Sequence, residues 1–130
     1  MILVGLILVG LAAAIHVYVF VLESLTWTAP RTRAAFGIRS LAEAETTQLL
    51  AFNQGFYNLF LAIIATVGIV LAVVGAASAG YALVLAGAGS MAAAGVVLAV
   101  SRPALLRAAL VQFLPPAVGL VALGVGTALG

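Results

Sequence analysis

The chain has 130 residues, of which 66% are hydrophobic and only 6% are charged. Soluble domains carry about 25% charged residues, so this composition excludes a water-soluble globular protein and favours the bilayer as solvent. The net charge is +2, with five basic residues, all arginine, against three glutamates. There is no cysteine, which leaves no disulfide, thiolate nucleophile or sulfur metal ligand.

Four apolar segments are long enough to cross a membrane, since one span needs about 20 residues. We predict an all-α fold, an integral membrane four-helix bundle in a single domain, with spans at about residues 2–24, 45–74, 81–100 and 104–129. No basic residue precedes the first apolar run, so we interpret it as a retained span rather than a signal peptide. A polar hinge is expected at residues 26–40, followed by Ser40 as a helix N-cap with Glu43 completing a capping box.

The arginines predict the orientation of the bundle. Arg31, Arg33 and Arg39 lie between the first and second spans, and Arg102 and Arg107 flank the turn between the third and fourth. With four spans these two loops fall on the same side of the membrane. The positive-inside rule therefore predicts a cytoplasmic location for both loops and an extracytoplasmic location for both termini, in the inner membrane. This charge pattern favours membrane orientation over nucleic-acid binding.

Small residues recur every four positions in the last two spans, and this spacing lets helices approach closely in lipid. The repeats are Ala82, Ala86, Ser90 and Ala94, and then Ala122, Gly126 and Gly130. Such faces are typical of packing within one bundle or of a homo-oligomer interface, and the pattern does not separate the two.

The few polar side chains within the spans are the candidate site, because polar groups in a membrane usually face the bundle interior. They fall on the first, second and fourth spans: His16, Glu23, Asn53, Gln54, Tyr57, Asn58 and Gln112. Comparing depths in antiparallel helices predicts that Glu23 meets Asn53 and that His16 meets Asn58. We expect a pocket in the cytoplasmic half that opens toward the arginine loops.

Each of these residues also has a purely structural interpretation. His16 is then a hydrogen-bonded helix clamp, and Glu23 an ion-pair partner for a loop arginine. The amide side chains act as interhelical hydrogen-bonding groups. Trp27 and Tyr57 are then interfacial aromatic residues.

The spacing of these residues resembles a known family. His16-Val17-Tyr18, Glu23, Trp27, Pro30-Arg31 and Phe36-Gly37, followed by Asn53-Gln54-Gly55-Phe56-Tyr57-Asn58, are similar to the small bacterial membrane proteins catalogued as domain of unknown function 1304. The resemblance extends over essentially the whole chain, including Gln112 in the last span. It implies the four-span fold and supports the choice of site residues. Some members carry an epimerase label, and the family implies no defined reaction.

The first functional hypothesis is an isomerase, epimerase or epoxide-opening enzyme acting on a lipid-soluble small molecule, without a cofactor. His16 is the expected general acid or base, because an imidazole titrates near neutral pH. Glu23 and Tyr57 are further catalytic candidates. Substrate binding is assigned to Trp27, Asn53, Gln54, Asn58 and Gln112, whose polar groups would hold a substrate oxygen.

Three alternatives remain from the sequence. The first is a haem-dependent isomerase, in which His16 is the candidate axial ligand of the haem iron. The second alternative is a non-catalytic binder or transporter of a small apolar or cationic compound, in which Glu23 pairs with the positive charge of the compound. The third alternative is a structural accessory subunit, whose polar residues only lock the helices together.

Overall fold

The computed structural model describes all residues 1–130 and is entirely helical. Four long helices confirm the predicted bundle, and each is long and apolar enough to cross a membrane. The elements in chain order are α1 (Ile2–Phe20), the π-helical turn η1 (Val21–Leu25), the short helix α2 (Pro30–Phe36), α3 (Leu41–Val73), α4 (Ala77–Ser101), the 3₁₀ turn η2 (Pro103–Leu105) and α5 (Leu106–Leu129).

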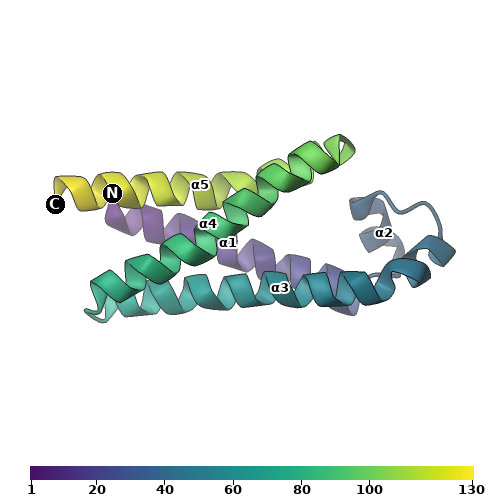
Figure 1. The fold of residues 1–130 in the computed structure, drawn as a ribbon, viewed down its shortest axis with the longest axis horizontal. Coiled ribbons are helices and arrows are strands. Elements are labelled where there is room, and N and C mark those ends of the chain that lie inside the picture. The colour runs from purple at the N-terminus through teal and green to yellow at the C-terminus, as the bar shows by residue number, and fades with distance from the viewer.

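The four long helices run along the length of the molecule (Figure 1), and their mutual contacts close a ring. α1 packs against α3 and α5, and α4 packs against the same two helices. The interior is built from small residues such as Ala12, Ala65 and Ala88, together with Met91, all fully buried. Large apolar side chains such as Leu3 and Leu85 point outward instead. In water this surface would be costly, and in a bilayer it contacts lipid chains.

The two stripes of small residues have different environments. In α5, Ala122 and Gly126 are buried, and a Cβ on Gly126 would lie 2.6 Å from the backbone nitrogen of Ile2 in α1. In α4, Ala82 and Ala86 are exposed on the outer face. The α5 stripe therefore serves packing within the bundle, while this part of the α4 stripe does not.

The predicted polar hinge contains a helix that the sequence analysis does not anticipate. Pro30 occupies the first turn of α2, and Gly37 ends it in the left-handed conformation with φ 68°. Proline at a helix start and glycine after its end are standard boundary signals, so the helix was detectable. The predicted N-cap of α3 is confirmed, because the Glu43 backbone N–H donates to Ser40 Oγ at 3.1 Å. The Glu43 carboxylate in turn accepts from the backbone N–H of Arg39 at 3.0 Å.

The two ends of the bundle differ in charge. Both termini and the α3–α4 turn lie at one end, and α2 and the α4–α5 turn lie at the other (Figure 1). All charged side chains belong to the second end, here called the arginine end: Glu23, Arg31, Arg33, Arg39, Glu43, Glu45, Arg102 and Arg107. The opposite end carries no charged side chain.

Candidate functional site

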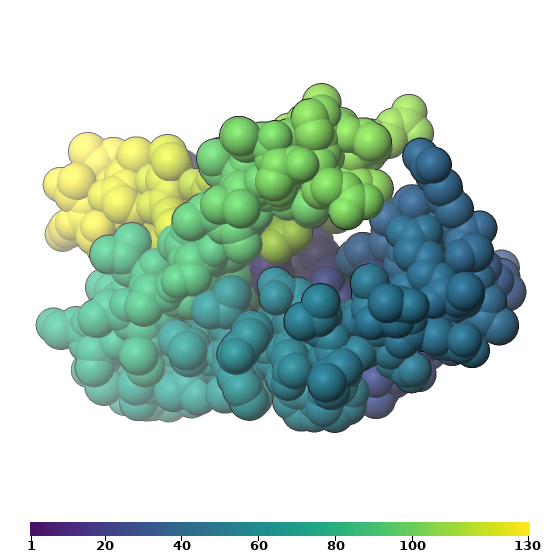
Figure 2. Space-filling model, turned by 45° about the vertical axis from the view of Figure 1, so that its right-hand side comes forward, coloured from purple at the N-terminus to yellow at the C-terminus, as the bar shows by residue number.

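A cavity of about 770 Å³ lies at the arginine end, with walls from α1, η1, α2, α3, α4 and α5. Figure 2 shows the molecule hollowed between α2 and the α4–α5 turn. The volume falls in the range of small-molecule pockets, about 300–1,000 Å³. Most lining residues are apolar. The polar and indole-bearing ones are Tyr18, Glu23, Trp27, Glu43, Thr47, Gln54, Tyr57, Asn58, Ser101, Arg102 and Gln112.

The central polar contact of this cavity joins α3 to the end of the first span. Asn58 Nδ2 donates to Glu23 Oε2 at 2.8 Å, and both residues are buried. The same amide nitrogen donates to the Gln54 carbonyl of its own helix at 3.2 Å. Glu23 Oε1 has no hydrogen-bond partner. It is not fully buried either, because His16 Nε2 is the one fully buried side-chain atom without a partner. Glu23 lines the cavity. One carboxylate oxygen is thus fixed and the other is available.

A local feature of the backbone brings Glu23 to this position. The first span ends in the π-helical turn η1, where the Thr26 N–H bonds the Val21 carbonyl five residues back. Such turns insert an extra residue and are frequent at functional sites. Ser24 Oγ then donates to the Phe52 carbonyl of α3 at 2.8 Å, so that the turn is tied to the neighbouring helix.

Gly55 allows the close approach of these two elements. A Cβ at this position would overlap Ser24 Oγ and lie 3.1 Å from both Glu23 Cβ and the Ser24 backbone nitrogen. Only glycine leaves room for η1 to pack this tightly against α3. This gives a physical reason for the glycine in the Asn-Gln-Gly-Phe-Tyr-Asn segment.

The predicted side-chain pairings were wrong. Glu23 meets Asn58 rather than Asn53, and His16 makes no hydrogen bond with Asn58. Asn53 is exposed and donates to the Leu49 carbonyl of its own helix at 3.1 Å. Asn58 lies five residues, or roughly 7.5 Å of helix, beyond Asn53 along α3. The comparison of depths did not include the close contact of Gly55 with Ser24, which brings Glu23 beside Asn58.

His16 lies away from the cavity, contrary to the expectation that it faces the pocket. It is fully buried and does not contribute to the lining. Its Nδ1 lies 2.9 Å from the Ala12 carbonyl, so the ring proton is assigned to Nδ1 and Nε2 is left as an acceptor. Nε2 has no partner, which is an uncommon state for a buried polar atom.

Trp27 connects the segment after η1 to α3. Its indole N–H donates to the Ala44 carbonyl and to Thr47 Oγ1, each at 3.1 Å, and its ring packs on Phe36 of α2 with a centroid separation of 5.0 Å. The indole N–H is therefore occupied, and the residue offers its ring face to the cavity. Thr47 was not predicted from the sequence, because only the fold brings it to Trp27.

The cavity gathers six of the eight predicted site residues and omits two. Glu23, Trp27, Gln54, Tyr57, Asn58 and Gln112 line it, whereas His16 and Asn53 do not. The contribution of α4 was not predicted, because its small residues were interpreted as packing within the bundle or as a homo-oligomer interface. Ala94, Val97, Ser101 and Arg102 form one wall, and no local sequence signal separates this face of a uniformly small and apolar helix from the others.

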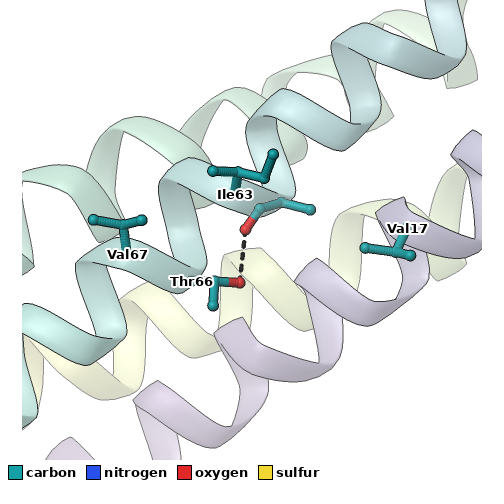
Figure 3. A pocket seen from close by; sticks show the side chains of 5 residues that line it. Val17, Ile63, Thr66 and Val67 are labelled. Atoms are coloured by element: carbon teal, nitrogen blue, oxygen red, sulfur yellow. Dashed lines mark hydrogen bonds between the residues drawn. The ribbon is translucent and has the colours of Figure 1, made fainter.

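A second, smaller depression of about 180 Å³ lies between α1 and α3. Figure 3 shows Val17, Ile63 and Val67 along it, with one polar side chain, Thr66. The Thr66 hydroxyl donates to the Ala62 carbonyl at 2.7 Å, so its donor is already used. This groove suits a lipid chain and offers no chemistry.

No group of three or more His, Cys, Asp or Glu side chains could hold a metal ion. In comparisons with known proteins, the family model described as "Protein of unknown function (DUF1304)" matches residues 10–124. Because this match includes most of the chain, the protein belongs to that family. No curated protein and no solved structure matches the chain.

Proposed function

We propose that this DUF1304 family member binds a small, largely apolar molecule in the cavity at the arginine end, and that Glu23 exchanges a proton with it. The observation that carries the proposal is the divided role of the Glu23 carboxylate. Asn58 fixes Oε2 at 2.8 Å, while Oε1 remains free beside a cavity of about 770 Å³. A positioned carboxylate within reach of a bound molecule is the basic requirement of acid–base catalysis.

The surrounding groups suit an isomerase or epimerase. Such a reaction removes a proton from one carbon and returns it to the same or a neighbouring carbon, so no oxidant or other reactant is consumed. Glu23 Oε1 would take the proton from one carbon and return it to a neighbouring carbon; for an epimerisation, the planar intermediate would have to turn its opposite face to Glu23 before the proton returns to the same carbon. The Gln112 amide and the Tyr57 hydroxyl line the same cavity and would donate hydrogen bonds to the oxygen on which negative charge develops.

The proposal changes the role expected for His16. Its imidazole does not line the cavity, so the general acid–base role passes to Glu23. A haem on His16 has less support, since the macrocycle needs a wide space beside Nε2 and His16 is fully buried. A Soret band in the purified protein would restore the haem hypothesis.

We also propose that the arginine end faces the cytoplasm and that both termini face the other side of the inner membrane. The support is the positive-inside rule applied to five arginines at one end and none at the other. The cavity would then open toward the cytoplasm and the inner leaflet.

The decisive experiment follows hydrogen exchange without knowledge of the substrate. Membranes containing the protein are incubated in D₂O, and small lipophilic molecules are surveyed by mass spectrometry for protein-dependent deuterium uptake at carbon. We expect uptake with the wild type and none with Glu23→Gln. Glu45→Gln is the matched control, because Glu45 is exposed at the start of α3 and does not line the cavity.

The alternatives give different results in the same experiment. A molecule that copurifies with the wild type and is lost from Glu23→Gln, without deuterium uptake, would identify a non-catalytic binder. The absence of both uptake and any retained molecule would refute the proposal and favour a structural subunit.

A further inference from the structure

The cavity is long compared with its width. Its lining on α3 runs from Glu43 to Leu61, and 18 residues at a rise of 1.5 Å span roughly 27 Å of helix. A cavity of about 770 Å³ that extends over this length is several times longer than it is wide. Such a shape suits one extended chain better than a broad ring system.

Two groups of polar lining residues lie at different levels of the cavity, one around Glu23 and Asn58 and the other at Arg102. On α4, a Cβ on Gly95 would lie 2.8 Å from Phe113 Cβ, and one on Gly87 would lie 2.9 Å from the Ala65 backbone nitrogen. Counting residues from these two contacts in antiparallel helices places Ala94 level with Asn58, the partner of Glu23, and places Gln112 opposite Val96, two residues or roughly 3 Å toward the mouth. The inner level is thus the Glu23–Asn58–Gln112 layer.

The outer level is the mouth of the cavity, where α4 ends. Ser101 and Arg102 line the wall there, seven and eight residues beyond Ala94 and therefore roughly 11–12 Å from the inner level along the helix. Apolar side chains such as Val97 and Leu98 lie between the two levels, and Ile15 and Leu61 line the wall beyond the inner one.

The arginine end as a whole carries a net charge of +2, from five arginines against three glutamates. Glu43 also lines the mouth, but its carboxylate accepts from the Arg39 N–H and occupies the positive end of the α3 dipole. Arg102 is exposed and lines the wall, and its guanidinium presents a planar set of donors that fits carboxylate and phosphate groups. Arg102 and Glu43 are the two charged residues that line the mouth, and the excess of arginine over glutamate at this end favours anions over cations.

From this arrangement, and resting on the proposed function, we propose that the ligand is a single-chain amphiphile with an anionic head held at Arg102. The group on which Glu23 acts lies part-way along the chain, roughly 12 Å from the head. The remaining chain extends toward Ile15 and Leu61. Carboxylate and phosphate heads share the required chemistry, and the experiment below separates them.

The test uses Trp27, which is the sole tryptophan and lines the cavity. The protein is placed in phosphatidylcholine nanodiscs, and its fluorescence is measured as chain-brominated hexadecanoate, hexadecyl phosphate, hexadecanol or hexadecylamine is added. Bromine quenches tryptophan on contact. We expect saturable quenching by at least one anionic chain at about a tenfold lower concentration than by the alcohol, the effect of roughly one charged hydrogen bond.

Two arginine variants test the site. Arg102→Gln should remove the preference for the anionic chain and leave binding of the alcohol unchanged. Arg107→Gln is the matched control, because Arg107 lies at the same end and does not line the cavity. Equal losses in both variants would overturn the assignment of Arg102 and indicate a diffuse surface charge instead.

The outcomes also separate this inference from the proposed function. Equal affinities for all four chains, or a preference for the amine, would overturn the anionic class while a binding cavity and proton exchange at Glu23 still stood. Failure of every chain to quench Trp27 saturably would overturn the ligand class and the proposed cavity together. Loss of deuterium exchange alone would refute catalysis and leave the amphiphile site in place.

Discussion

The contact between η1 and α3 makes Gly55→Ala the most informative single substitution. The new methyl group would overlap Ser24 Oγ and lie 3.1 Å from Glu23 Cβ and from the Ser24 backbone nitrogen. Rotating the serine away loses its bond to the Phe52 carbonyl, which costs about 1 kcal/mol. The remaining 3.1 Å contacts with Glu23 Cβ and the Ser24 nitrogen are tight and cannot be relieved by side-chain rotation, and overpacking of this kind costs typically about 1–3 kcal/mol.

The expected loss is therefore about 2–4 kcal/mol in the free energy of unfolding. Gly89→Ala is the matched control, because it is also glycine in a helix and its Cβ would meet nothing within 4 Å. There the expected change is a gain of at most about 1 kcal/mol, since alanine is the better helix former. The measurement is unfolding in mixed detergent micelles, followed by circular dichroism.

A functional readout accompanies the stability measurement. Pushing η1 away from α3 should separate Glu23 from Asn58, so Gly55→Ala should also lose deuterium exchange under conditions where it remains folded. Wild-type stability of Gly55→Ala, or an equal loss in Gly89→Ala, would refute the close-packing argument.

Three further predictions follow from individual contacts. Asn58→Ala leaves a buried carboxylate oxygen without its donor and should destabilise the protein by about 1–3 kcal/mol, whereas the exposed Asn53→Ala should stay within about 0.5 kcal/mol; equal effects in detergent unfolding would contradict the register. His16→Leu removes a buried, unpartnered nitrogen and should leave stability equal or higher, so a clear loss in the same unfolding assay would reveal a partner for Nε2. The chain has no cysteine, so a membrane-impermeant maleimide reports the side of the membrane on which an introduced cysteine lies. Ala76→Cys in the α3–α4 turn should be labelled in cells with a permeable outer membrane, and Ala34→Cys in α2 should be labelled only after lysis. The reverse pattern would mean an inverted topology.

The sequence alone determined the parts of this protein that depend on composition and local pattern. Apolar runs of membrane length predicted four helices, and Ser40 with Glu43 predicted the start of α3. Both follow from interactions within one helix or with lipid. The resemblance of the Asn53–Asn58 segment to a known family likewise needs no contact between helices.

The tertiary structure decided what these side chains meet. A π-helical turn and one glycine set the register in which Glu23 finds Asn58, and that register is a property of two helices packed together. Residue counting on ideal helices cannot supply it. The same packing seals His16 in the core and makes α4, which has an almost uniform sequence, a wall of the cavity. The polar residues were therefore recognisable from sequence, and their division into cavity wall, buried core and outer surface was not.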